Sequence, residues 1–235
     1  MSVEPTRADP IAGISSIATR HLLGELAAAY ERRSGQATAV ESIGGVEAMR
    51  RVQAGEAFDF VVLAAEAIHQ LGHAGRIVPE SRVELARSGV AVAVAAGAPR
   101  PGIGDEHAVR RAVLAARAVG YSTGPSGVHV ARLLERWGIA EGAGPRLVQA
   151  PPGVPVGTLL ARGDVELGFQ QLSELLHLPG IDVIGTLPPE IQVTTTFTAA
   201  ACKTSKRLDE TRALLAFLGS PEADAAKRRQ GMEPA

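Results

Sequence analysis

The segment GEAFDFVVLAAEAI, residues 55–68, is the part of the sequence that best indicates the fold. Its apolar run at 58–64 has the length and composition of a buried strand, and Gly55 precedes it. The residues that follow, 66–74, have the pattern of a helix. Because short apolar runs and helical segments alternate in the same way along the chain, the sequence predicts an α/β fold.

The same patterns place further elements on either side of this segment, and most strands are expected to be parallel and buried. Strands are predicted at 10–14, 37–41, 58–64, 89–95, 118–121, 146–149, 166–169, 181–185 and 193–201. Helices are predicted at 17–33, 46–54, 66–74, 106–116, 126–137, 156–162, 171–176, 208–218 and 222–230. A glycine closes several of these helices, as Gly35 does after the first.

Composition excludes several classes of function. The 235 residues are 46% hydrophobic, which is enough for one large domain or two lobes of about 100 residues each. A formal net charge of −1 gives no broad basic surface for nucleic acid or an anionic membrane. Aromatic residues are only 3%, so base stacking on single strands is not expected. The expected partner is a small anion.

The N-terminal residues and the cysteine content bear on the compartment. Residues 1–10, MSVEPTRADP, lack the basic and apolar regions of a secretion signal, which predicts a cytoplasmic protein, or a periplasmic one if a signal peptide has been removed. No apolar run reaches the length of about 18 residues needed for a membrane span. The single cysteine, Cys202, excludes an intramolecular disulfide and is expected to be a small buried side chain.

Four stretches have the composition of a loop that opens a helix and presents backbone N–H groups to an anion. Such helix N-termini carry unpaired N–H groups and a partial positive charge, and small residues let an anion approach the backbone. Together they would hold an anion without a lysine. The stretches are Ser15-Ser16, Ser42-Ile43-Gly44-Gly45, Ser122-Thr123-Gly124-Pro125-Ser126-Gly127 and Pro151-Pro152-Gly153-Val154-Pro155.

The elements of the chain follow in this order: a strand, Ser-Ser, a long helix and a strand ending in Ser-x-Gly-Gly, then residues 55–68 and ARSGVAVAVAAGAP at 86–99. In this order the chain resembles the type II periplasmic-binding-protein superfamily, in its molybdate-binding-protein-like branch. The resemblance implies a two-lobed Venus-flytrap fold, each lobe a mostly parallel sheet flanked by helices. Lobe one would contain 1–87 and 195–235, and lobe two 88–194. Ligand would bind in the cleft between them, closed by a hinge motion.

The same resemblance implies where the ligand contacts lie. The family's ligand loops fall on Ser15, Ser16, Ser42, Gly44, Gly45, on Tyr121 with Ser122, Thr123, Ser126 and Gly127, and on Gly153, Val154 and the residues up to Val156. Molybdate binders typically have a tyrosine near the end of a strand in lobe two, where this chain has Phe169-Gln170-Gln171. The amides of Gln170 and Gln171 suit carboxylates and hydroxyls better than a tetrahedral oxyanion.

Two segments, YSTGPSGVHVARLLERWGI at 121–139 and VELGFQQLSELLHLPGIDVIGTLPPEIQ at 165–192, carry a narrower resemblance. They are similar to molybdate-binding-like proteins that include the bacterial aconitate isomerases, together with many solute-binding proteins. The resemblance implies an allylic proton shift between cis- and trans-aconitate. A base removes a methylene proton, the charge spreads over a dienolate, and preorganised N–H groups stabilise the developing charge.

Three residues are candidates for the base, and each has a plainer explanation. His129 lies in the first turns of its predicted helix and could face the ligand, or it could lie on the helix surface. Glu41 precedes Ser42 at a strand end, but strand alternation could turn it to solvent. Tyr121 could shuttle a proton or simply pack in the core. Arg20, one turn beyond Ser16, could bind a second carboxylate or be solvated.

No cofactor or metal is predicted. His69 and His73 have the i, i+4 spacing of a zinc pair, but the sequence offers no third ligand. The glycine-rich loops lack the lysine of a P-loop, which disfavours nucleotide hydrolysis. Two functions from different classes therefore stand. One is an isomerase acting on an unsaturated polycarboxylate. The other is a non-catalytic solute-binding protein for a small anion, an organic acid in preference to molybdate, that would have a permease or a sensor as its partner.

Overall fold

The computed structural model describes residues 9–139 and 144–235, so most of the N-terminal segment used for the compartment prediction lies outside it. The chain divides into two compact units. Unit 1 contains the residues through Leu85 together with Phe197–Lys227, and unit 2 contains Ala86–Thr196 and Arg228–Ala235. Residues 228–235, expected in lobe one, thus group with unit 2, because Glu233 and Pro234 pair with Arg87 and Ala86.

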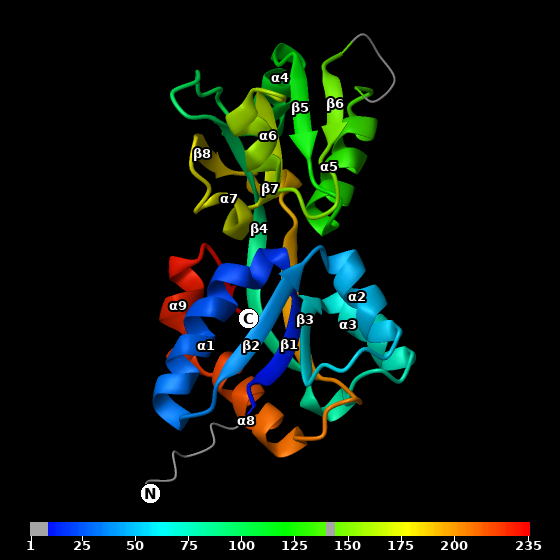
Figure 1. The fold of residues 1–235 in the computed structure, drawn as a ribbon. Helices are drawn as coiled ribbons and strands as arrows, with labels where there is room; N and C mark the ends of the chain where they lie inside the picture. The colour runs from blue at the N-terminus through cyan, green and yellow to red at the C-terminus, as the bar shows by residue number, and fades with distance from the viewer. Residues whose placement is uncertain (1–8, 140–143) are drawn as a thin grey trace, which may run out of the picture. The chain divides into compact units, whose positions relative to one another are not determined.

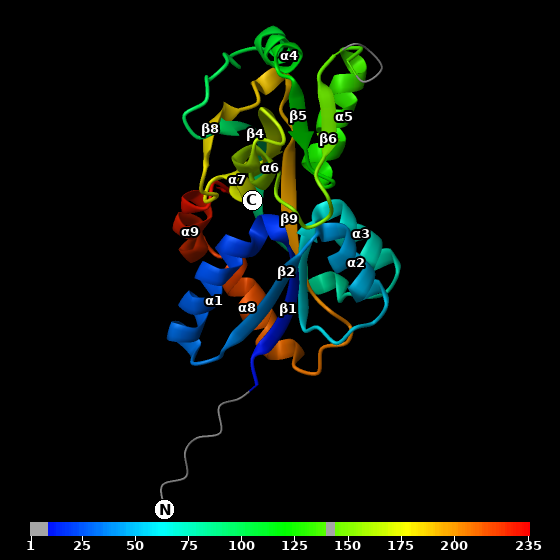
Figure 2. The same cartoon turned by 45° about the horizontal axis from the view of Figure 1, so that its top comes forward.

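Unit 1 is built on three parallel strands. The sheet order is β2-β1-β3-β9, and β9 runs antiparallel to β3. Helices α1 and α8 cover one face of this sheet, and α2 and α3 cover the other (Figures 1 and 2). The strands are β1 (Ile11–Ser16), β2 (Thr38–Ile43), β3 (Phe60–Ala64) and β9 (Thr194–Ala201). The helices are α1 (Arg20–Ser34), α2 (Gly45–Gln53), α3 (Ala65–His73) and α8 (Leu208–Gly219), with short 3-10 turns at Ile17–Thr19, Pro79–Ser81 and Pro221–Ala223.

Unit 2 repeats this plan. The sheet order is β4-β7-β5-β6, with β5 parallel to both β6 and β7, and β8 and β10 pair with β4. The strands are β4 (Val83–Ala95), β5 (Ala118–Tyr121), β6 (Arg146–Gln149), β7 (Leu167–Gln171), β8 (Ile181–Thr186) and β10 (Glu233–Pro234). The helices are α4 (Glu106–Ala115), α5 (Pro125–Arg136), α6 (Val156–Arg162) and α7 (Leu172–Leu175), with a 3-10 turn at Pro189–Ile191. Helix α9 (Asp224–Arg229) and strand β9 span the boundary between the units.

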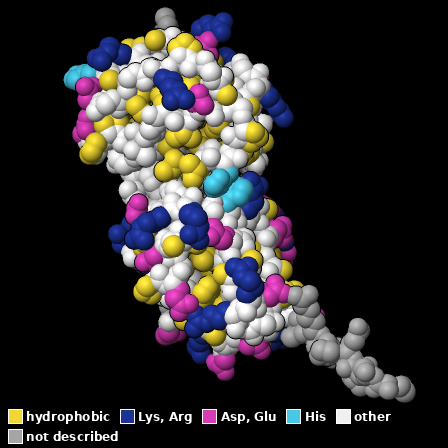
Figure 3. All heavy atoms as spheres, turned by 90° about the vertical axis from the view of Figure 1, so that its left-hand side faces the viewer, with side chains coloured by type: hydrophobic (Ala, Val, Ile, Leu, Met, Phe, Trp, Pro, Cys, Tyr) yellow, Lys and Arg dark blue, Asp and Glu magenta, His cyan; other side chains and the backbone are white. Residues whose placement is uncertain are grey.

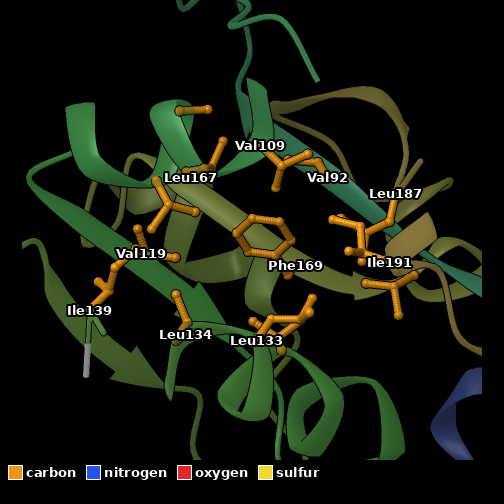
Figure 4. Packing of buried hydrophobic residues seen from close by; sticks show 14 of the residues in the cluster. Val92, Val109, Val119, Leu133, Leu134, Ile139, Leu167, Phe169, Leu187 and Ile191 are labelled. Carbon is orange, nitrogen blue, oxygen red and sulfur yellow. The ribbon is translucent and has the colours of Figure 1, made fainter. Parts of the chain in front are cut away.

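Strand alternation gives unit 2 a separate core on each face of its sheet. Val90, Val92 and Val94 of β4 pack with α4 and α5 around Phe169, as Figure 4 shows for this cluster. Ala91 and Ala93 face the opposite way, toward α6. The valine side chains of β4 therefore pack against α4 and α5 on one face of the sheet, and the alanine side chains pack against α6 on the other.

The structure corrects three predicted elements. The helix predicted at 17–33 is interrupted, because the Ser16 hydroxyl accepts from the Ala18 N–H and caps a 3-10 turn before α1 begins at Arg20. The strand predicted at 89–95 begins at Val83, because β4 runs through both units. The predicted dominance of parallel strands holds only for β1–β3 and β5–β7, since β4, β8, β9 and β10 pair antiparallel with their neighbours.

Candidate functional site

Two predicted ligand residues of unit 1 form a hydroxyl pair. Parallel pairing of β1 with β2 places Ser15 opposite Ser42. Their Oγ atoms lie 2.8 Å apart, within hydrogen-bond distance. Ser15 is fully buried, whereas Ser42 is partly exposed. Either serine can donate in this pair, and the Ser15 hydroxyl also lies 3.3 Å from the Ser16 carbonyl oxygen. When Ser15 donates to Ser42, the Ser42 hydrogen is left for an outside acceptor.

Two more predicted residues lie beside this pair. Ser16, the last residue of β1, is partly exposed, and its carbonyl accepts from the Thr19 hydroxyl at 2.9 Å. A Cβ added to Gly45, the first residue of α2, would lie 3.7 Å from Ser16 Oγ, so the start of α2 borders Ser16. Gly44 is the residue that caps α2. Arg20 is exposed, and its guanidinium lies 3.4 Å from His21 Nε2.

Glu41 belongs to a different surface of unit 1. Neighbouring residues of a strand point to opposite faces, so Glu41 points away from the face of Ser42. Its exposed carboxylate accepts from Arg51 at 2.5 Å. Arg51 also pairs with Glu56 and lies over the Phe58 ring. The hydrogen bonds to Glu56 and Glu41 raise the pKa of the arginine. The structure therefore gives Glu41 a surface ion pair and no contact with the hydroxyl pair.

Unit 2 has a hydroxyl pair of its own. Ser122 follows β5, Ser126 lies in the first turn of α5, and their Oγ atoms are 3.0 Å apart in a buried environment. Gly127 makes this turn possible, because a Cβ at that position would lie 1.7 Å from the Ser122 carbonyl oxygen. Gly124 caps α5, and Thr123, between Ser122 and Gly124, is partly exposed.

The two hydroxyl pairs occupy equivalent places in their units. In unit 1, β1 lies between β2 and β3, and the helices that follow β1 and β2 cover opposite faces. In unit 2, β5 lies between β6 and β7, with α5 and α6 on opposite faces. Ligands of open α/β sheets bind at such a switch point, beyond the carboxyl ends of the strands. Each hydroxyl pair lies at the carboxyl end of the central strand.

Gln170 is engaged inside unit 2. Its side-chain oxygen accepts from the Val156 N–H at 2.7 Å, and its nitrogen donates to the Glu174 carboxylate at 2.5 Å. Gln170 is 2% exposed, and its amide binds the N–H of Val156, the first residue of α6 after Pro155. A buried backbone N–H without a partner costs free energy, so this contact accounts for a glutamine at this position.

Gln171 joins three strands. In the orientation that satisfies both side-chain atoms, its nitrogen donates to the Ser88 carbonyl at 2.9 Å and its oxygen accepts from the Thr195 hydroxyl at 2.7 Å. β7 is thereby tied to β4 and to the first residues of β9. Both glutamine amides, which the sequence suggested as ligand contacts, thus have partners within the protein.

The loop before α6 is the most exposed of the four predicted stretches. Gly153 has a positive φ of 78°, which suits glycine, and the Val154 N–H donates to the Pro151 carbonyl at 3.0 Å to close a turn. Gly153 is exposed and Val154 is partly exposed. No hydroxyl comes from this loop, so any contribution to an anion would come from backbone groups.

His129 and Tyr121, the two remaining candidate bases, both lie close in sequence to the hydroxyl pair of unit 2. His129 is partly exposed on α5, three residues after Ser126 and therefore on the same side of the helix. Its Nε2 atom lies 2.7 Å from the Ile191 carbonyl oxygen. Tyr121 ends β5 opposite Phe169 and packs partly against the apolar cluster.

The remaining candidates do not converge on either hydroxyl pair. Cys202 is buried, and burial raises the pKa of its thiol to about 12, with nearby Asp59 as a second cause. His69 and His73 lie on α3, away from any further ligand, and the described ranges contain no cluster of three or more histidine, cysteine, aspartate or glutamate side chains able to hold a metal ion. Within residues 9–139 and 144–235, no helix is long and apolar enough to cross a membrane.

Charge is mixed on the surface. On the face drawn in Figure 3, lysine and arginine side chains alternate with aspartate and glutamate, and neither sign forms a continuous area. This agrees with the net charge of −1. A small anion would therefore be recognised by local donors and not by a general field.

Residues 12–233 match the family described as bacterial extracellular solute-binding proteins. The chain belongs to this family. As a member of the extracellular solute-binding family, it is expected to bind a small solute, and the resemblance to periplasmic-binding-protein folds is confirmed. The compartment in the family's description differs from the cytoplasm expected from the N-terminal sequence.

Among relatives, this family member is 33% identical to an aconitate isomerase from a Pseudomonas species, over 97% of this chain and 90% of the relative. Its fold is similar to the periplasmic molybdate-binding protein of Azotobacter vinelandii, with a TM-score of 0.77, 20% identity and coverage of 94% and 98% of the two chains. The sulfate-binding protein of Mycobacterium tuberculosis gives a TM-score of 0.77 at 16% identity, covering 96% and 87%. Both structural likenesses concern the fold alone.

Two features of the site were not found from the sequence. The Ile191 carbonyl, which His129 contacts, is a backbone group 62 residues away, and no side-chain pattern marks it. Glu174, the partner of Gln170, lies four residues further along, after a strand has given way to a short helix. A carboxylate at that spacing was a usable signal for an internally bonded glutamine.

Proposed function

We propose that this protein is an aconitate isomerase-like enzyme that binds an unsaturated polycarboxylate and moves its double bond by an allylic proton shift. The observation that carries the proposal is the 33% identity to an aconitate isomerase over nearly the whole of both chains. The two hydroxyl pairs at equivalent switch points support it, since they supply donors for carboxylates without a fixed cation. A role in binding solute follows from the family itself.

The hydroxyl pairs would bind carboxylates of the substrate. In unit 1, Ser42 donates its free hydrogen, Ser16 adds a second hydroxyl, and the first N–H groups of α2 follow Gly44 and Gly45. In unit 2, the pair is formed by Ser122, which precedes α5, and Ser126 in its first turn. Each hydrogen bond to a charged oxygen contributes about 1.5 to 3 kcal/mol.

Further contacts come from predicted residues whose side chains do not form a pair. Thr123, Gly127 and Gly153 would offer backbone N–H groups to the ligand, the Val154 N–H being engaged by the Pro151 carbonyl, and exposed Arg20 would meet a third carboxylate. Arginine suits this role because its planar group binds a carboxylate through two bonds. Gln170 fixes the start of α6, and Gln171 links β7 to β4 and β9.

The reaction removes a proton from the methylene carbon next to a carboxylate. The C–H electron pair forms a new double bond, the original double bond shifts, and charge accumulates on carboxylate oxygens. The proton then returns at the far carbon, so the atoms balance without a further reactant. Donors already directed at the carboxylates stabilise the dienolate more than the substrate, which is the condition for catalysis.

The base must be a titratable group near a hydroxyl pair. Glu41 is directed to the surface and paired with Arg51, which leaves His129 and Tyr121 beside Ser126 and Ser122. Imidazole has an ordinary pKa close to neutrality and accepts a proton more readily than a phenol does.

A non-catalytic solute-binding protein for an organic anion is the second candidate, and the family description favours it. Its partner would be a permease or a sensor, and its location would be outside the cytoplasmic membrane.

Incubation of the purified protein with trans-aconitate in D₂O tests the proposal. The enzyme produces the cis isomer and exchanges the methylene protons, whereas a receptor binds the ligand without either change. Molybdate and sulfate, added in competition, report whether the same site takes inorganic oxyanions. Full occupancy by molybdate with no affinity for aconitate would contradict both organic-anion candidates.

A further inference from the structure

The His129 side chain has one nitrogen fixed by the backbone. Its Nε2 atom lies 2.7 Å from the Ile191 carbonyl oxygen, and a carbonyl oxygen only accepts hydrogen bonds. Nε2 therefore carries the hydrogen. In the neutral ring the second nitrogen, Nδ1, then has a free lone pair, and Nδ1 has no hydrogen-bond partner among the described residues.

The Ile191 carbonyl is held in place by its own surroundings. Ile191 is 3% exposed and ends the 3-10 turn Pro189–Ile191. The next residue, Gln192, bonds to both backbone groups of Val90 in β4, accepting from its N–H at 2.9 Å and donating to its carbonyl at 3.0 Å. The acceptor for His129 is thus part of a rigid segment and not of a free loop.

We infer that Nδ1 of His129 is the atom that takes the substrate proton, and that the Ile191 carbonyl orients the ring for this role. The inference rests on the proposed isomerase function. His129 is a partly exposed residue on the same side of α5 as Ser126, so it lies on the side of the helix that carries the hydroxyl pair of unit 2.

The carbonyl keeps its hydrogen bond to the ring throughout the proton transfer. When Nδ1 takes the proton, the ring becomes an imidazolium and its Nε2–H becomes a stronger donor to the same oxygen. A carboxylate performs this task for the histidine of serine proteases, and here a neutral carbonyl does so. The proton on Nδ1 is then returned to the far carbon of the dienolate, which restores the neutral ring.

Two variants and one control test the assignment. His129→Gln keeps an N–H donor for the Ile191 carbonyl but has no base. We expect it to bind aconitate with a Kd within about twofold of the wild type and to lose methylene exchange by about 100-fold or more. His129→Ala removes both roles. His107→Gln, at an exposed position of α4 outside the site, is the matched control and is expected to exchange at the wild-type rate.

The tautomer is measured independently of activity. Long-range ¹H–¹⁵N correlation on histidine-labelled protein, assigned by the signal that His129→Gln lacks, should show protonated Nε2 and bare Nδ1 at a pH where the ring is neutral. The opposite tautomer, or wild-type exchange in His129→Gln, would overturn the inference while the isomerase function stands. Absence of methylene exchange in the wild-type protein would overturn both the isomerase function and the role of His129. The NMR tautomer measurement cannot give this result, so the two failures are distinguishable.

Discussion

The Oγ atoms of Ser15 and Ser42 lie 2.8 Å apart, although 27 residues separate them in the sequence. The contact follows from the register of two parallel strands, which places the two serines opposite one another. Unit 2 also has a hydroxyl pair, formed there by a local contact: the Oγ atoms of Ser122 and Ser126 lie 3.0 Å apart where the chain passes from the central strand into α5. The protein thus repeats one device, a hydroxyl pair at a switch point, in both of its units.

Ser42→Ala is expected to weaken aconitate binding by about 1 to 3 kcal/mol, which corresponds to about 5- to 150-fold in Kd. The substitution removes the hydroxyl that is left to donate when Ser15 bonds to it. Isothermal titration calorimetry measures the change. Ser34→Ala is the control, since its hydroxyl bonds to the Tyr30 carbonyl at the end of α1. An unchanged Kd in Ser42→Ala would remove this residue from the site.

A double-mutant cycle tests whether the serines act as a pair. Because Ser15 orients Ser42, we expect the double variant to lose less affinity for aconitate than the sum of the losses in Ser15→Ala and Ser42→Ala. Additive losses would mean that each hydroxyl contacts the ligand independently.

Gly127→Ala is expected to destabilise the protein by about 3 kcal/mol, the upper end of overpacking effects. The added Cβ would meet the Ser122 carbonyl oxygen at 1.7 Å, and this backbone cannot give way without moving the hydroxyl pair. Gly24→Ala, in the exposed middle of α1 with no atom within 4 Å of the added Cβ, should stabilise by about 0.5 to 1 kcal/mol. Urea unfolding gives both values, and equal midpoints for the two variants would contradict the geometry.

Gln170→Leu separates a structural glutamine from a ligand contact. Loss of the acceptor for the buried Val156 N–H should lower the free energy of unfolding by about 1 to 3 kcal/mol. The folded variant should bind aconitate with a Kd within about threefold of the wild type, a bound well below a lost charged hydrogen bond. A loss of affinity as large as that of Ser42→Ala, without a change in stability, would show that the amide meets the ligand.

The buried thiol of Cys202 is expected to make the free energy of unfolding depend on pH in alkaline solution. Burial raises the pKa of its thiol from 9.0 to about 12. The unfolded chain therefore ionises first, so the stability contributed by the neutral thiol is complete below pH 9 and is lost as the pH rises toward 12. In Cys202→Ala this part of the slope should disappear from urea unfolding measured between these pH values.

The same burial makes Cys202 a probe of unfolding. A thiol reagent at pH 8 should label the native protein only at the rate of its opening, and should label it at once in denaturant. Immediate labelling of the native protein would contradict the buried position.

The sequence predicted the alternating architecture because apolar runs such as 58–64 are unambiguous at this length. It also indicated the loops at Ser15, Ser42 and Ser122, since small residues before a helix carry a local signal. Pairing of the hydroxyls was not predictable, because the register of β1 with β2 is decided by contacts between residues far apart in the chain.

Side chains with two possible uses were the weakest part of the sequence interpretation. The amides of Gln170 and Gln171 suit a ligand or a buried N–H equally well, and only the packed structure shows their internal partners. Glu41 shows the same limit, because its ion pair with Arg51 depends on how α2 returns along β2. The partner of His129 is a backbone carbonyl, and a backbone group has no signal in the amino-acid sequence.

Proton NMR of the purified protein with trans-aconitate in D₂O tests the central claim most directly. We predict that the cis isomer appears and that the methylene signal disappears as deuterium replaces its protons, both at rates proportional to protein concentration. Ligand signals that broaden on binding, with neither isomerisation nor exchange, would contradict the enzyme function and identify a solute receptor.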